Sequence, residues 1–172
     1  MSQLLKQIGI YGYEVVEFEE NHRTSQLHVR YEDRPKSCRK CQADGSKLKS
    51  KGLYQRSVRH LKAFGRDVRL NVKCRRFQCE ACQKSFVQAL PGIVGGRRSS
   101  EPYRFELYQL HRKGVSGKEL AQDSKLGSAT VERIYQEFTQ RKSAERISLD
   151  CPRILGIDEH SDHTGQRFAT TF

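Results

Sequence analysis

Alternation of apolar and polar residues marks the first part of the chain. Residues 14–20 alternate, and residues 27–32 alternate again after a turn-rich stretch at 21–25. A period of two is typical of β-strands, and a short turn between two such runs favours a hairpin. A small apolar stripe with helical spacing precedes them. The pattern therefore predicts an N-terminal module at residues 1–35, made of a short helix and a β-hairpin.

Two longer stretches in the next part of the chain also have the pattern of strands. Gly52–His60 and Arg66–Phe77 alternate apolar with basic or polar residues, and Gly65 marks the turn between them. These strands lie within a cysteine-containing module that we place at residues 36–90. The residues that follow, 91–102, are rich in glycine and serine, so their composition predicts a linker.

Helical spacing replaces alternation in residues 103–145, where apolar residues recur at intervals of three and four. Ser116 and Glu119 have the spacing of a capping box, and Ser128 is placed to cap the next helix. Residues 115–138 therefore predict two capped helices joined by a tight turn. This arrangement is typical of a helix-turn-helix, and a plain helical hairpin is the alternative.

The last part of the chain, residues 146–172, returns to short strands. Residues 154–157 are apolar and lead to Asp158, and residues 166–172 have a second strand pattern. The predicted fold class is α+β, with an N-terminal hairpin, a cysteine module, a helical module and a C-terminal hairpin.

Charge is distributed unevenly over these modules. The chain of 172 residues has a formal net charge of +12. Nineteen lysines and arginines but only four carboxylates lie between Arg34 and Arg104, whereas the rest has 13 basic and 16 acidic residues. A phosphate backbone is the expected partner of such a surface. An anionic membrane is disfavoured, because no basic amphipathic helix stands out.

The sequence also bears on the compartment. No apolar run approaches the roughly 20 residues of a membrane span. The N-terminus lacks the features of a signal peptide. We therefore expect a cytoplasmic protein whose cysteines are reduced.

Four of the six cysteines form two Cys-x-x-Cys pairs, Cys38 with Cys41 and Cys79 with Cys82. Paired cysteines in a reducing compartment are typical metal ligands, and four thiolates make a closed, structural zinc site. Two such pairs with strands between them predict a zinc ribbon, in which the metal supplies about 10–16 kcal/mol of folding free energy. The alternative is a set of free, buried cysteines, which is what we expect of Cys74 and Cys151.

Basic and hydroxyl side chains supply the candidate DNA contacts. In a helix-turn-helix the second helix enters the major groove with its N-terminal residues first. The candidate contacts are Arg75, Arg76, Arg97, Arg98, Lys118, Lys125, Ser128, Thr130 and Arg133. For the two arginine pairs, solubilising charge and a solvated connector are the alternatives.

Asp158 is the candidate catalytic residue. An aspartate at the end of an apolar strand is costly unless it binds a cation or joins a hydrogen-bond network. Sites that transfer phosphoryl groups with two metal ions use such carboxylates as ligands. An aspartate that merely caps a turn is the alternative.

Taken together, these segments resemble the ISL-three family of bacterial insertion-sequence transposases. The motifs that carry the resemblance are CRKC at 38–41, VKCRRFQCEAC at 72–82, VSGKELAQDSKLGSATVERI at 115–134 and ILGIDEHSDHTGQRFATTF at 154–172. The resemblance implies a zinc ribbon, a helix-turn-helix and a ribonuclease-H-like catalytic domain. It also implies binding to double-stranded DNA at the terminal inverted repeats of a mobile element.

The resemblance also gives Asp158 a role, as the first aspartate of the family's Asp-Asp-Glu triad. The family's later acidic residues lie far downstream, whereas only Glu159 and Asp162 follow here. We therefore expect the DNA-binding portion of a truncated transposase that is inactive alone, with Mg²⁺ needed only by an intact catalytic domain. Expected protein partners are a second copy of the chain or an intact transposase.

Two other functions fit parts of the sequence. A stand-alone zinc-dependent regulator, or an inhibitor of transposition, would bind the same DNA. A zinc-ribbon module for RNA or protein is the third hypothesis. It is disfavoured because stacking on bases needs surface aromatics, and the basic segment offers only Tyr54, Phe64 and Phe77.

Overall fold

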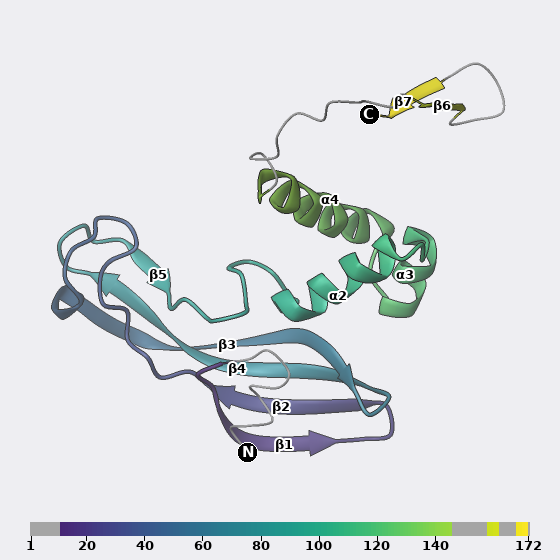
Figure 1. The fold of residues 1–172 in the computed structure, drawn as a ribbon. Helices are drawn as coiled ribbons and strands as arrows, with labels where there is room; N and C mark the ends of the chain where they lie inside the picture. The colour runs from purple at the N-terminus through teal and green to yellow at the C-terminus, as the bar shows by residue number, and fades with distance from the viewer. Residues whose placement is uncertain (1–10, 146–157, 162–167, 172) are drawn as a thin grey trace. The chain divides into compact units, whose positions relative to one another are not determined.

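The computed structural model describes residues 11–145, together with the backbone of residues 158–161 and 168–171 (Figure 1). The described residues form an α+β fold with a five-stranded sheet, three α-helices and a separate two-stranded sheet. This confirms the predicted fold class at the level of its secondary structure. The chain divides into two compact units, residues 1–138 and 139–172.

The larger sheet combines two segments that the sequence analysis assigned to separate modules. Its strands are β1 (Glu14–Glu20), β2 (Thr24–Arg30), β3 (Leu48–Ala63), β4 (Arg66–Cys79) and β5 (Ser85–Val87). Their order is β1-β2-β4-β3, and β5 pairs with the far end of β4. β2 runs parallel to β4, whereas the other pairs are antiparallel. The predicted N-terminal hairpin is therefore present, and it continues the sheet of the cysteine module.

β3 and β4 form one long hairpin that extends from the cysteines to the rest of the sheet (Figure 1). Phe64 and Gly65 make its two-residue turn, with φ values of 51° and 74°. Such turns suit the right-handed twist of the flanking strands. Gly52, at φ 108°, lies in the bulge between Ser50 and Leu53, where only glycine adopts the conformation at low cost. Both strands are longer than the sequence predicted.

One face of the sheet is covered by apolar side chains from the segment that follows β5. Val58, Leu70 and Val72 are fully buried there, and Leu90 and Ile93 pack against them. On this face, β-branched residues at alternate strand positions provide the burial that stabilises the sheet.

The segment predicted as a linker is packed against β3. The Arg59 backbone donates to the Arg98 carbonyl, and Ser100 N–H donates to the Arg59 carbonyl. Ser100 is fully buried. Residues 91–100 are therefore part of the folded structure and not a solvated connector. A glycine is favoured at position 96, in the open loop of this segment, because φ is 78° there.

The helical region has the three predicted helices, α2 (Glu101–Arg112), α3 (Gly117–Ser124) and α4 (Ser128–Glu145). Ser116 caps α3 by accepting from Glu119 N–H at 3.2 Å, as the capping pattern predicts. Ser128 was expected to cap α4, but it is the first residue of that helix. The Gly127 carbonyl before it accepts from Thr130 N–H at 2.8 Å.

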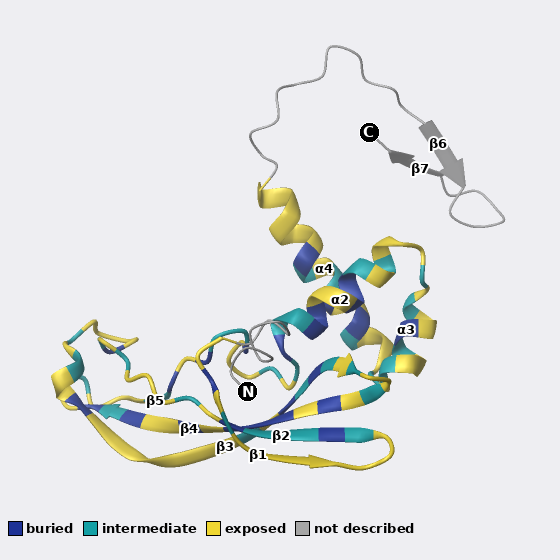
Figure 2. Ribbon diagram, turned by 60° about the horizontal axis from the view of Figure 1, so that its bottom comes forward, coloured by how far each residue is buried: buried dark blue, intermediate teal, exposed yellow. Residues whose placement is uncertain are grey.

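The helices share a core of aromatic and aliphatic side chains. Tyr108 lies 5.3 Å from Phe138 between ring centroids, and Leu120, Val131 and Ile134 are buried beside them. These residues recur every three or four positions, so each helix turns one apolar side to the others. Past Phe138, the described part of α4 is exposed (Figure 2).

The C-terminal unit contains a short antiparallel hairpin of β6 (Asp158–Ser161) and β7 (Phe168–Thr171). A hairpin was predicted here, but β6 begins at Asp158, the residue at which the first predicted strand was expected to end. Asp158 begins β6 and pairs with Thr171. Residues 154–157 and Cys151 lie outside the described residues.

Candidate zinc centre and basic surface

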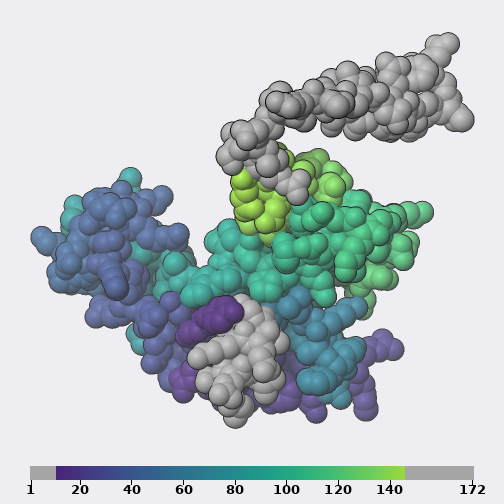
Figure 3. All heavy atoms as spheres, viewed as in Figure 1, coloured from purple at the N-terminus to yellow at the C-terminus, as the bar shows by residue number. Residues whose placement is uncertain are grey.

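The two Cys-x-x-Cys segments fold into matching turns that lie side by side (Figures 1 and 3). Cys38 N–H donates to the Ala43 carbonyl at 2.8 Å, and Cys79 N–H donates to Lys84, also five residues on, at 3.0 Å. Gln42 and Gln83, each directly after the second cysteine of its pair, have φ values of 60° and 57°. The repeated Cys-x-x-Cys-Gln pattern is a sequence signal for these turns. It was not among the motifs used to predict them.

The four sulfur atoms gather at a spacing that suits one zinc ion. Cys38 Sγ lies 3.8 Å from Cys82 Sγ, and Cys41 Sγ lies 3.7 Å from Cys79 Sγ. All four sulfurs are within 4.8 Å of one another. A tetrahedral site with Zn–S distances of about 2.3 Å has sulfur–sulfur edges of about 3.8 Å. The donor set therefore fits a structural Cys₄ zinc centre in both chemistry and geometry.

The electrostatics of the turns also favour a cation. Backbone N–H groups of Cys41 and Lys40 point at the sulfur of Cys38 and lower the pKa of that thiol to about 6. At Cys41 the amide of Ala43 favours the thiolate. Desolvation and the neighbouring sulfurs outweigh it, however, and raise the pKa of that thiol to about 12. Four thiolates in this space need a divalent cation to balance their charge.

Few apolar side chains surround the sulfurs. Leu48 and Phe77 are the two large buried residues beside Cys38 and Cys79. Gly45, in the short 3₁₀ turn Gly45–Lys47, approaches the backbone of Lys36 so closely that a Cβ atom would lie 2.9 Å from its carbonyl oxygen. A cluster this small supplies little hydrophobic stabilisation, so the metal must hold this end of the hairpin together.

Cys74 is a fifth thiol that stays apart from the centre. It is fully buried in the core of the sheet, and its Sγ lies 3.3 Å from the Tyr54 carbonyl. Burial raises the pKa of this thiol. The expectation of a free, buried side chain is confirmed for Cys74.

The predicted DNA contacts lie on several surfaces. Most are exposed, namely Arg75, Arg76, Arg98, Lys118, Lys125, Ser128 and Arg133, whereas Thr130 and Arg97 are partly buried. Arg75 and Arg76 lie on β4 near the cysteines, and the others lie in the helical region or just before it. Of the last group, Arg97, Arg98 and Thr130 line one groove.

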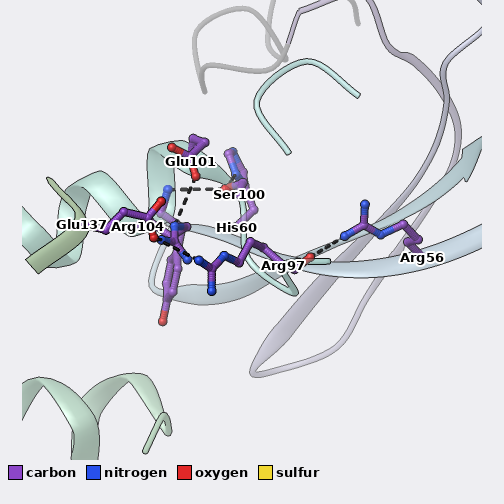
Figure 4. Close-up of polar contacts among 8 residues, drawn as sticks. Arg56, His60, Arg97, Ser100, Glu101, Arg104 and Glu137 are labelled. Atoms are coloured by element: carbon purple, nitrogen blue, oxygen red, sulfur yellow. Dashed lines mark hydrogen bonds and ion pairs between the residues drawn. The ribbon is translucent and has the colours of Figure 1, made fainter. Parts of the chain in front are cut away.

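A buried ionic cluster joins α2 to α4 (Figure 4). Arg104 is 3% exposed, and it contacts Glu137 Oε2 at 2.5 Å and Glu101 Oε1 at 3.2 Å. Arg97 reaches the same Glu137 oxygen at 3.2 Å. The Arg97 guanidinium is therefore already engaged within the protein, although the sequence analysis offered it for DNA. Arg104 and Glu137 were not singled out from the sequence.

A second polar contact ties the helices to the sheet. Buried His60 on β3 places Nδ1 2.7 Å from the Ser100 hydroxyl, which also caps α2 by accepting from Tyr103 N–H (Figure 4). Arg59 on β3 donates to the Ser124 carbonyl at the end of α3. The helices are thus fixed on the long hairpin by hydrogen bonds as well as by packing.

The turn between α3 and α4 has the length of a helix-turn-helix connection. Three residues, Lys125 to Gly127, separate the helices, and Lys125 has a left-handed conformation with φ 51°. Leu126 points inward and packs against the helical core. Short turns of this kind, often with a glycine, are typical of the motif.

Comparison with known proteins identifies the cysteine region. Residues 34–82 match the family described as the zinc-finger of transposase IS204/IS1001/IS1096/IS1165. The match covers the first Cys-x-x-Cys pair, the β3–β4 hairpin and the second pair, so this part of the chain is similar to the zinc ribbon of ISL3-type transposases. Neither a curated protein nor a solved structure matches the chain. None of the helices in the described residues is long and apolar enough to span a membrane.

Proposed function

We propose that this chain is the DNA-binding portion of an insertion-sequence transposase, which recognises the terminal inverted repeats of its element in the cytoplasm. The observation that carries the proposal is the transposase zinc-ribbon match over four cysteines whose sulfurs fit one zinc ion. The net charge of +15 between residues 34 and 104 supports a polyanionic partner, because it places the basic field over the ribbon and the adjoining sheet.

In this proposal α3 and α4 act as a helix-turn-helix, and α4 enters the major groove with its first turns. Ser128 and Arg133 are exposed there and would contact base edges, with Thr130 beside them. Lys118 and Lys125 flank this surface and would contact phosphates. Phosphate contacts fix the register of the protein, whereas the α4 contacts supply sequence preference.

The catalytic part of the resemblance concerns Asp158 alone. On the resemblance, Asp158 would be one ligand of a magnesium ion that an intact catalytic domain holds with carboxylates from elsewhere. The DNA-binding proposal does not depend on this residue.

Selection of bound duplexes from a random pool, with the zinc-loaded chain as bait, tests the proposed function. We expect enrichment of one sequence motif, with affinity that falls steeply with salt because counterions are released. The variant Ser128→Ala/Arg133→Ala should keep non-specific binding but lose the motif preference, each lost base contact costing about 1–3 kcal/mol of discrimination. Gln140→Ala, an exposed change later in α4, is the control. Binding with no enriched motif, or with no dependence on salt, would contradict the proposal.

A further inference from the structure

A groove runs along the outer edge of β3. It has a volume of about 1380 Å³, and its walls are the segment Phe86–Ser99 on one side and the turn from α3 into α4 on the other. Figure 3 shows the hollow between the residues around the cysteines and those of the helices. The groove thus lies between the zinc ribbon and the candidate helix-turn-helix.

The side chains that line this groove are strongly basic. Arginines line it from five elements: Arg39 from the first cysteine turn, Arg56 and Arg59 from β3, Arg69 from β4, Arg97 and Arg98 from the segment before α2, and Arg104 from α2. No aspartate or glutamate is among its lining residues in the described part of the chain. A concave surface of one charge focuses its field and attracts counterions of the opposite sign. The groove is therefore built for a polyanion.

The arginines divide into two groups by their contacts. The side chains of Arg56 and Arg59 donate to backbone carbonyls, and those of Arg97 and Arg104 pair with Glu137. These contacts fix the walls. Arg69 and Arg98 are exposed and form no ion pair within the described residues. They are the side chains that remain available to a ligand, together with Arg39.

The edge strand of the sheet also lines the groove. β3 is the last strand in the order of the sheet, and its edge is bridged at Arg59 to Ser99. The stretch Tyr54–Ser57 lines the groove along the same edge. Thr130, in the first turn of α4, lines the groove as well.

We propose that this groove binds one phosphate strand of duplex DNA, and that it links the zinc ribbon to the helix-turn-helix on a continuous DNA site. The inference rests on the proposed function and adds a binding surface to it. From Tyr54 to Arg59, β3 extends about 17 Å at roughly 3.3 Å per residue. A groove of that length can contact more than one phosphate of a strand that runs along it. The groove recognises the charge and shape of the DNA backbone. It therefore adds affinity for DNA without a preference for particular bases.

The test compares two double variants of the zinc-loaded full chain that remove equal charge. Arg69→Gln/Arg98→Gln removes the two available groove arginines. Arg23→Gln/Lys62→Gln removes two exposed charges that do not line the groove. Binding to a fluorescent mixed-sequence duplex DNA is measured as a function of salt. The slope of log affinity against log salt should fall by about 1.8 for the groove variant, at roughly 0.9 for each phosphate contact, and should not change for the control.

Further measurements distinguish the loss of charge from a loss of structure, and binding to DNA from binding to RNA. Arg69→Lys/Arg98→Lys should keep the wild-type slope, and zinc content and thermal unfolding should match the wild type in all variants. A groove variant whose slope equals that of the control would overturn the inference while the proposed function stands. A wild-type chain that fails to bind the duplex would overturn both. Groove-dependent binding of a mixed-sequence RNA duplex as tight as that of DNA would overturn the assignment to DNA.

Discussion

The zinc-ribbon end of the β3–β4 hairpin and the helical region are stabilised by different means. Among the described residues around the sulfurs, only Leu48 and Phe77 are large, buried apolar side chains. In the helical region seven buried side chains form one core, and a buried arginine is paired with two carboxylates beside it. The first region therefore depends on a metal ion, and the second on packing and a satisfied ionic cluster.

This difference shows how a short, basic chain with 35% hydrophobic residues can form two structured regions. At the ribbon end of the hairpin, zinc takes the place of an apolar core, and the surface there is basic. The helices have an apolar core of their own, and α2 contacts β3. Each region should therefore respond to its own perturbation.

Zinc removal should have the largest effect. Chelation, or the substitution Cys79→Ser, should unfold the ribbon, because structural zinc contributes about 10–16 kcal/mol in such sites. Hydrogen exchange followed by mass spectrometry should show lost protection in residues 36–50 and 76–87, with protection of α2 and α4 largely retained. Loss of protection in every element at the same chelator concentration would contradict the separation of the two regions.

Shortening a side chain in the helical core should have the opposite effect to zinc removal: the helices are destabilised and the zinc centre stays intact. Ile134 is 2% exposed, and Ile134→Ala should destabilise the helices by about 2–5 kcal/mol, because it leaves a cavity. Thermal unfolding and zinc titration of the same sample provide the measurement. We expect a lower unfolding midpoint with unchanged zinc stoichiometry. A variant that loses both together would show one cooperative unit.

Removal of one partner from the ionic cluster should cost somewhat less. Glu137→Gln leaves the buried Arg104 without its 2.5 Å partner, although Glu101 remains close by. We expect a loss of about 1–3 kcal/mol in the free energy of unfolding, measured in urea. Glu106→Gln, an exposed change on α2, is the matched control. Equal effects of the two substitutions would show that the cluster contributes no stability.

The smallest effect concerns the buried thiol. Because burial raises the pKa of Cys74 above its ordinary value of 9.0, the thiol stays protonated near neutral pH and reacts slowly. Its contribution to stability is present below the unfolded-state pKa and is lost as pH rises through the raised folded-state value. Alkylation of the zinc-loaded chain at about pH 8, located by mass spectrometry, should spare Cys74. Rapid alkylation there in folded protein would contradict its placement.

Local features of this fold could be predicted from the sequence. The spacing of the four cysteines predicted the zinc donors, and alternation predicted β1 to β4. The Ser116–Glu119 pair predicted the start of α3. Each of these signals depends on residues close together in the chain, where a periodicity or a cap has a direct geometric meaning.

Features that depend on distant contacts could not be predicted. The parallel pairing of β2 with β4 joins residues about forty positions apart, and its register follows from packing on the covered face. Arg104 has the sequence context of a surface charge on α2. Its burial follows from Glu137, which lies 33 residues later. The composition of residues 91–102 concealed the contacts that Ile93 and Ser100 make with the sheet.

The most direct test of the account is X-ray absorption at the zinc edge of the purified chain, together with metal analysis. We predict one zinc ion per chain with four sulfur neighbours at about 2.3 Å. Less than stoichiometric metal, or nitrogen or oxygen neighbours at about 2.0–2.2 Å in the first shell, would contradict a centre formed by Cys38, Cys41, Cys79 and Cys82.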